Sequence, residues 1–168
     1  PSLTDYLVDT SVPLSHVVAE TDGEGTPKAA YIRGDDLLAI HRASAVRFVH
    51  GDGLGSIRRL TDEAGSITDT YEYTAFGELL SHVGEDPQPY QFAGEPRDPN
   101  SGFYYNRARW LDPRVGRFAS VDPLDAELDA DDELGTDPRE LHRYTYALSD
   151  PVGFVDPSGR FSIGEAMT

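Results

Sequence analysis

The sequence predicts a mainly β protein made of successive antiparallel hairpins that end in an irregular, Asp-Pro-rich region with little helix. Three observations support this fold class. Where apolar residues follow any period, they recur at every second position, as in half-buried strands. Turn residues are frequent, since 16 Gly and 12 Pro together make one residue in six. Nine Tyr and seven Phe supply the aromatic side chains that strands favour.

The first 44 residues contain three segments with strand-like alternation. We expect strands at 14–21, 29–33 and 37–42, with a glycine-containing turn at 23–25. An isolated two-stranded hairpin is only marginally stable in water. These hairpins must therefore pack against one another or against further neighbours.

Residues 45–82 repeat the pattern more clearly, as a meander of two or more hairpins. The expected strands cover 45–50, 56–61, 66–73 and 78–82, separated by turns at 51–55, 62–65 and 74–77. Gly65 suits a tight turn because glycine adopts positive φ without steric cost. Tyr71 and Tyr73 stand two positions apart, so a strand places both rings on one face.

The segment 125–140 differs from the rest because it carries eight acidic side chains and a single base, Arg139. We expect a solvated loop or short helix there. Asp129 and Asp131 suggest calcium, but an EF-hand loop that begins at Asp129 would have Leu134 where the glycine is required. A solvated insert is the better interpretation.

Bulk composition excludes several classes of function. The formal net charge of -16 opposes binding to nucleic acid, and no run of 18 apolar residues predicts a membrane span. Zero Cys removes disulfides, thiolate metal sites and a cysteine nucleophile. The five His have no metal-ligand spacing. We therefore expect no metal, no cofactor, no nucleic-acid partner and no membrane insertion.

Asp precedes seven of the twelve prolines, whereas chance would give about one. The pairs end at Pro87, Pro99, Pro113, Pro123, Pro138, Pro151 and Pro157. A residue before proline is kept out of the helical region, and an Asp carboxylate there accepts hydrogen bonds from nearby backbone N–H groups. Most of these pairs are expected to be rigid corners and nothing more.

Two of the Asp-Pro clusters lie inside longer signatures that resemble a known family. Residues 102–123 combine a Tyr-rich stretch, Arg, Asp-Pro, Gly-Arg-Phe and a second Asp-Pro; residues 144–159 combine Tyr-x-Tyr with Val-Asp-Pro-x-Gly. They resemble the opening and the end of the RHS-repeat-associated core of Rhs/YD-repeat proteins. Upstream, the segments 53–56, 60–62, 71–73 and 76–78 resemble a YD repeat, in which Thr74 stands where the repeat would place Asp.

The resemblance implies YD-repeat hairpins that spiral into a hollow β-shell, closed at one end by the core region. It divides the chain into shell hairpins at 1–92, the core or plug at 93–160, and the truncated start of a downstream cargo segment at 161–168. In polymorphic toxins and toxin complexes of this family, the shell encloses a carboxyl-terminal effector. The implied partners are the rest of the shell, that cargo and a secretion or injection apparatus, with a bacterial or archaeal secreted or cell-surface location.

The resemblance also implies release of the cargo by aspartyl-type self-cleavage just after the Asp-Pro-x-Gly element, near 159–161. Such hydrolysis needs two carboxylates of different protonation and a cation to stabilise negative charge. Carried onto this sequence, the catalytic residues are Asp122 and its charge partner Arg109, with Asp112 as the second carboxylate or a structural corner. The recognition element comprises Asp156, Pro157, Gly159 and Arg160, and Asp156 is less favoured than Asp122 and Asp112 as a catalytic group. The activity would be at most a single-turnover self-cleavage, with no external substrate.

Alternatives to self-cleavage stay open at this stage. The family has Leu after the Asp-Pro-x-Gly glycine, and Arg160 would not suit an apolar pocket. The chain would then be a purely structural or cell-surface YD-repeat segment that is never cut. A carbohydrate-binding module is a third possibility, because Trp110 and the tyrosines could stack on sugars, although such rings more often form core or interstrand pairs.

Overall fold

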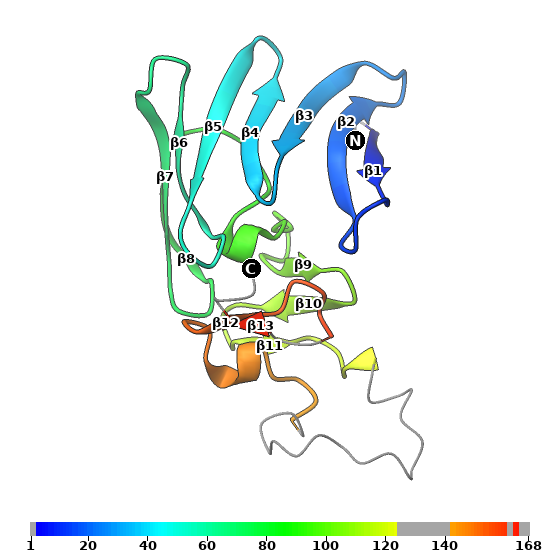
Figure 1. Cartoon of the computed structure of the whole chain (residues 1–168), viewed down its shortest axis with the longest axis vertical. Helices are drawn as coiled ribbons and strands as arrows, with labels where there is room; N and C mark the ends of the chain where they lie inside the picture. Colours follow the sequence, from blue (N-terminus) through cyan, green and yellow to red (C-terminus); the bar gives the residue numbers. More distant parts are fainter. Residues whose placement is uncertain (1–2, 124–141, 161–162, 165–168) are drawn as a thin grey trace.

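The computed structural model describes residues 3–123, 142–160 and 163–164. Eight antiparallel strands form one sheet in which every strand pairs with its sequence neighbour (Figure 1). They are β1 (Thr4–Asp9), β2 (His16–Asp22), β3 (Pro27–Arg33), β4 (Leu37–Arg42), β5 (Ala45–Gly51), β6 (Ile57–Thr61), β7 (Ile67–Tyr73) and β8 (Leu79–Val83). The predicted mainly β hairpin fold is confirmed.

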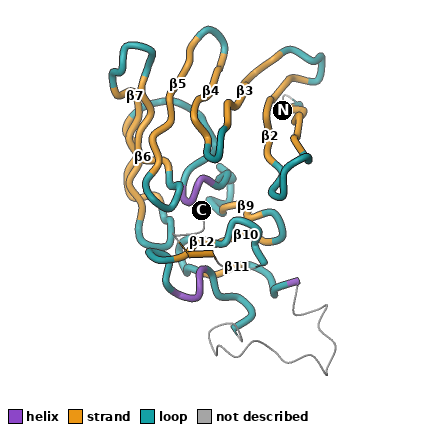
Figure 2. Tube along the Cα trace, viewed as in Figure 1, coloured by secondary structure: helices purple, strands orange, loops and turns teal. Residues whose placement is uncertain are grey.

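The second part of the chain lies against one end of this sheet (Figure 1). From here on, the name plug covers its described residues 90–123, 142–160 and 163–164, a wider range than the 93–160 expected from the sequence. Its elements are η1 (Phe92–Gly94), β9 (Tyr104–Asn106), β10 (Arg109–Asp112), β11 (Arg117–Phe118), η2 (Ala147–Ser149), β12 (Phe154–Val155) and β13 (Ile163–Gly164). Turns and loops connect these short strands and single-turn helices (Figure 2). The expected irregular region with little helix is therefore present.

Four hairpin turns share one hydrogen-bonding arrangement. The first residue of each, Asp22, Asp52, Asp62 or Thr74, is followed three positions later by a glycine with positive φ. In the Asp turns, one carboxylate oxygen accepts from the backbone N–H groups two and four residues ahead. Thr74 Oγ1 accepts only from Glu78 N, at 3.0 Å. A hydroxyl therefore replaces the carboxylate at the one turn where the sequence departs from the YD pattern.

The inner face of the sheet and the plug share one hydrophobic core. Tyr71 and Tyr73 are buried on the same face with parallel rings whose centroids lie 6.5 Å apart, as the sequence predicted. Tyr73 packs edge-on against Phe92 of η1, and Phe92 contacts Tyr146. The core thus extends across residue 92, which remains our predicted boundary between shell hairpins and plug.

The turn between β5 and β6 attaches the sheet to the plug. Ser56 is buried, and its Oγ accepts a hydrogen bond from Ala93 N at 2.9 Å. Ile57 N donates to Gln91 O, also at 2.9 Å. Gly94 lies close to this turn, since a Cβ built there would stand 3.3 Å from Gly55 O. The segment 53–56 therefore holds the sheet against residues 91–94 of the plug.

The structure differs from the sequence prediction mainly at the ends of the strands and in the additional strand β1. The expected strands match β2–β8 within about two residues at each end. Strand β1 was not expected; Tyr6, Leu7 and Val8 are all exposed, so it lacks the alternating pattern of a half-buried strand. The acidic segment 125–140 lies outside the described residues. Within the described part of the chain, no helix is long and apolar enough to cross a membrane.

Candidate functional site

The Asp-Pro corners adopt two different arrangements. In five of them a carboxylate oxygen accepts from a backbone N–H two to four residues ahead, as predicted: Asp86, Asp98, Asp112, Asp150 and Asp156. The sixth described corner, Asp122, directs Oδ2 to Arg109 Nη2, at 2.7 Å. The same nitrogen lies 3.2 Å from Asp156 Oδ2. Two carboxylates 34 residues apart in sequence therefore converge on one guanidinium.

Arg109 lies at the start of β10 with a side chain only 3% exposed. Its guanidinium carbon stacks 3.7 Å above the centre of the Phe118 ring, which fixes the plane of the group. Nε donates to Gly159 O at 2.5 Å, and Nη1 donates to Arg143 O at 3.3 Å. Burial excludes water, so this cation acts on its carboxylates in an environment of low dielectric constant.

The turn formed by residues 156–159 is clamped by the hairpin between β9 and β10. Four consecutive carbonyl oxygens each accept one hydrogen bond from four consecutive residues: Asp156 O from Asn106 Nδ2 (2.6 Å), Pro157 O from Arg107 Nη1 (2.5 Å), Ser158 O from Ala108 N (3.2 Å) and Gly159 O from Arg109 Nε (2.5 Å). Every pair is separated by 50 residues. Because all four carbonyls are held, the turn has a fixed position relative to Arg109.

Gly159 is required at its position by this clamp. Its φ is +68°, and a Cβ built there would stand 2.3 Å from Asn106 O and 2.9 Å from Arg109 N. Any side chain would push the turn away from the hairpin. The close approach of the two backbones at this position therefore requires glycine.

Burial shapes the protonation of the acids in this region. Desolvation raises the pKa of Asp156 above its ordinary value, against the opposing influence of Arg109 and of hydrogen bonds from Ser158. Desolvation also raises the pKa of Glu95 to about 7, although Arg107 counteracts it. Carboxyl groups that lie close together and differ in exposure can hold different protonation states at one pH.

The structure gathers most of the predicted site residues but leaves Asp112 apart. Arg109, Asp122 and the turn containing Asp156, Pro157 and Gly159 form one cluster. Asp112 instead pairs with Arg114 at 2.7 Å, and the hydrogen bonds from Arg114 lower the pKa of Asp112. Arg160 is exposed, with its backbone N 3.1 Å from Asp156 Oδ1. The two alternatives for Asp112, second carboxylate or structural corner, both remain predictions.

Sequence reasoning missed the two residues that complete the clamp, Asn106 and Arg107, and the buried acid Glu95. Both clamp residues lie within the motif that carries the family resemblance, but their partners lie 50 residues away. Glu95 carried no sequence signal for burial, since charged side chains are usually exposed. Among the described residues, no group of His, Asp or Glu side chains is arranged to hold a metal ion.

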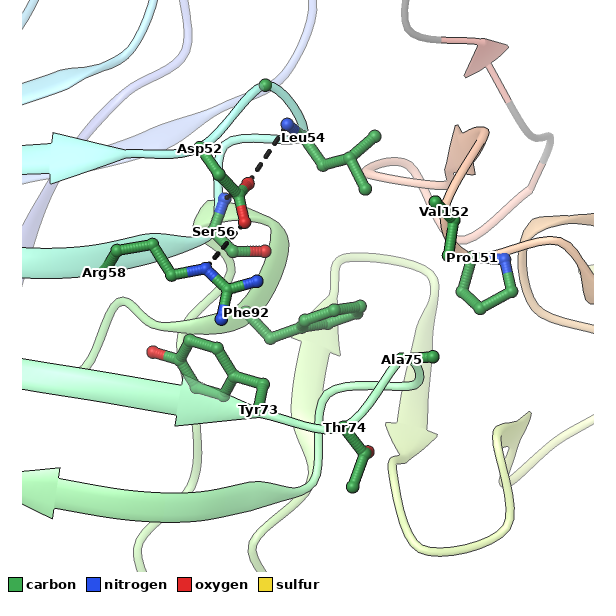
Figure 3. A pocket seen from close by; sticks show the side chains of 11 residues that line it. Asp52, Leu54, Ser56, Arg58, Tyr73, Thr74, Ala75, Phe92, Pro151 and Val152 are labelled. Atoms are coloured by element: carbon green, nitrogen blue, oxygen red, sulfur yellow. Dashed lines mark hydrogen bonds and ion pairs between the residues drawn. The ribbon is translucent and has the colours of Figure 1, made fainter.

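A cleft of about 310 Å³ opens elsewhere, between the turn at the start of β6 and the η2–β12 loop (Figure 3). Arg58 forms one wall, with Nε 2.7 Å from Asp52 Oδ2 and its guanidinium over the Tyr73 ring. Pro151 and Val152 form the opposite wall. None of the Arg109 cluster lines this cleft, so it is separate from the candidate site.

Comparison with known proteins gives one consistent result. Residues 9–152 match the family model described as teneurin YD-shell. "Double-stranded DNA deaminase toxin A" of Burkholderia cenocepacia is 30% identical over 96% of the chain, and "Toxin protein Tse5" of Pseudomonas aeruginosa is 35% identical over 68%. The chain spans only 11% and 8% of these relatives. A structure of the Photorhabdus luminescens Tc holotoxin pore superposes over 93% of the chain and 8% of its own, with TM-score 0.66 and 20% identity.

Proposed function

Because this chain belongs to the teneurin YD-shell family, we propose that it closes one end of an Rhs-type β-shell and cuts itself to release an enclosed segment. The family expected from the YD-repeat motifs is the one that the comparison found. The relatives' names include toxins, and the chain corresponds to a small part of each. The partners that follow are the remaining hairpins of the shell and a carboxyl-terminal toxin or effector.

The end-closing role is supported by the way the plug lies on the sheet. Hairpins β1–β8 follow one another in simple sequence order, which suits a wall that grows by addition of further hairpins. The plug interrupts this order and packs its aromatic core against the inner face of the wall. A segment that turns inward in this way closes the end of a shell instead of extending it.

Self-cleavage is supported above all by the convergence of Asp122 and Asp156 on Arg109 Nη2. In the proposed step, Asp122 takes a proton from a water molecule. The water oxygen then bonds to the carbonyl carbon of Gly159 or, for the next bond, of Arg160. The Arg109 guanidinium stabilises the oxyanion, and Asp156 gives a proton to the leaving nitrogen. Burial raises the pKa of Asp156, which favours the protonated form that this step requires. The C–N bond then breaks, leaving a new carboxyl terminus and a new amino terminus.

The bond between Gly159 and Arg160 already has suitable contacts. Arg109 Nε donates to its carbonyl oxygen, and Asp156 Oδ1 lies 3.1 Å from its nitrogen. The next bond, after Arg160, is one residue further along. The proposal covers both bonds. Since the Arg160 side chain is exposed, no apolar pocket has to accept it.

The roles of the three Asp residues are tested by the full natural polypeptide carrying Asp122→Asn, Asp156→Asn or Asp112→Asn. Quantifying the uncut chain over time after refolding gives each cleavage rate. We expect the first two substitutions to slow cleavage by about a hundredfold or more, and the third to leave the rate near wild type. Cleavage by Asp122→Asn at the wild-type rate would refute the assignment, and a folded wild-type chain that is never cut would refute self-cleavage.

One observation supports a second candidate function, in which the chain is not cut and binds glycans at a cell surface. Tyr105 and Trp110 lie opposite each other on β9 and β10, with ring centroids 5.0 Å apart and 41% of each residue exposed. Paired exposed rings can stack on sugars. Binding of the folded protein to a glycan array, lost on Trp110→Ala, would favour this second function over release.

A further inference from the structure

Arg107 occupies a backbone position that does not suit arginine. It is the first residue of the two-residue turn between Asn106 and Arg109, and its φ is 54°. The left-handed conformation is unfavourable for a non-glycine residue. The surrounding structure must hold a residue in such a conformation. At Arg107 the contacts of the guanidinium supply part of this support.

One nitrogen of Arg107 connects two parts of the plug. Nη1 lies 2.7 Å from both carboxylate oxygens of Glu95 and donates to Pro157 O at 2.5 Å. Glu95 is itself 4% exposed and held by its backbone, since its N–H donates to Phe92 O and its carbonyl accepts from Gln91 N. The carboxylate is therefore a fixed anchor, and Arg107 transmits its position to the carbonyl that follows Asp156.

We propose that Glu95 and Arg107 form a buried positioning pair that holds the 156–159 turn so that Asp156 stays aligned with Arg109. Neither residue touches the reacting atoms. The pair fixes Pro157 O, whereas other groups hold the three remaining carbonyls of the turn, so removal of the pair frees the turn at Pro157. The consequence for cleavage rests on the proposed function, whereas the consequence for the turn does not.

The decisive variant is Arg107→Gly, because glycine relieves the backbone strain while it removes the guanidinium. A matched control exists in the shell sheet. Ala43 is the first residue of the two-residue turn between β4 and β5, with a φ of 55°, and Ala43→Gly relieves the same strain without removing a polar contact. Hydrogen exchange of the Gly159 and Arg160 amides is measured in the full natural polypeptide of wild type and of each variant, with Asp122→Asn added to all of them so that the chain stays uncut.

We expect Arg107→Gly to accelerate exchange at these two amides by about tenfold or more, Ala43→Gly to leave it unchanged, and Arg107→Lys to restore part of the protection. Glu95→Gln keeps the shape of the anchor but removes its charge, so it should accelerate exchange to a smaller extent. Wild-type exchange in Arg107→Gly would overturn the positioning role.

Cleavage rates of the same variants, with Asp122 intact, separate this inference from the proposed function. If wild type is cut, Arg107→Gly should be cut at least about tenfold more slowly, and Arg107→Lys should recover part of the rate. An unchanged rate in Arg107→Gly would overturn the pair's role in cleavage. If wild type is never cut, self-cleavage fails, and the exchange measurements still decide whether the pair positions the turn.

Discussion

At the scale of single residues, the plug depends on contacts that only one side chain satisfies. Arg109 combines a stacked guanidinium with four separate acceptors, and lysine could not reproduce this planar set of donors. Among the six described Asp-Pro corners, Asp122 and Asp156 are the two whose carboxylates meet this guanidinium. The role of an Asp-Pro pair therefore depends on which residues surround its carboxylate in the fold.

Gly159→Ala tests the tightest of these contacts. The added methyl group would overlap Asn106 O in a left-handed conformation, so we expect a loss of roughly 2–4 kcal/mol in the free energy of unfolding. Denaturant titration of the variant measures the loss. Gly25→Ala is a suitable control, because its φ is also positive but no atom lies within 4 Å of the added Cβ. Equal losses in the two variants would show that the close approach is unimportant.

At the scale of elements, the hairpin turns repeat one hydrogen-bonding pattern. An Asp at the first position satisfies two backbone N–H groups, and the glycine three positions later takes positive φ. This turn sets the register of the two strands that it connects. Thr74 satisfies one N–H group only, so this turn lacks a hydrogen bond that the others have.

Thr74→Asp should therefore stabilise the protein. The carboxylate would accept from the backbone N–H of residue 76 in addition to that of Glu78, and we expect a gain of about 0.5–1 kcal/mol. Asp62→Ala removes both such bonds at another turn and should cost about 1 kcal/mol or more. Thermal unfolding of both variants is the measurement. Destabilisation by Thr74→Asp would contradict the equivalence of the turns.

At the scale of the whole molecule, the core joins the sheet to the plug and buries charge at their junction. Burial and the charge of Asp156 raise the pKa of Glu95, whereas the charges of Arg107 and Arg33 lower it. The pair therefore weakens the fold at neutral pH while it positions the turn, a common cost of functional sites.

The pH dependence of unfolding should reveal this cost. The pKa of Glu95 is about 7 in the folded protein and near 4.5 in the unfolded chain, so the folded state binds the proton more tightly. Its contribution to stability is complete below pH 4.5 and is lost as the pH rises through 7. Relative to wild type, Glu95→Gln should gain stability between pH 4.5 and 7, by roughly 3 kcal/mol at most. A constant difference across this range would contradict the burial of the charge.

The sequence predicted the hairpins well because their signals are local. Alternation, glycine and Asp positions define β2–β8 and their turns without reference to distant residues. It also predicted Arg109 and Asp122, through motifs that the family carries. The clamp depends on contacts across 50 residues, and Asp112 and Asp122 are indistinguishable as Asp-Pro pairs until the fold shows which one meets Arg109. These contacts between residues distant in sequence follow from the fold, and local sequence patterns do not predict them.

The central claim is that this end of the shell cuts itself just after the Asp-Pro-x-Gly element, by attack of water. The most direct test refolds the full natural polypeptide in water enriched in ¹⁸O and determines the masses of the products. The account predicts an upstream product that ends at Gly159 or Arg160 and carries one solvent oxygen in its new carboxyl group. A folded chain that stays intact, or a break elsewhere, would contradict it.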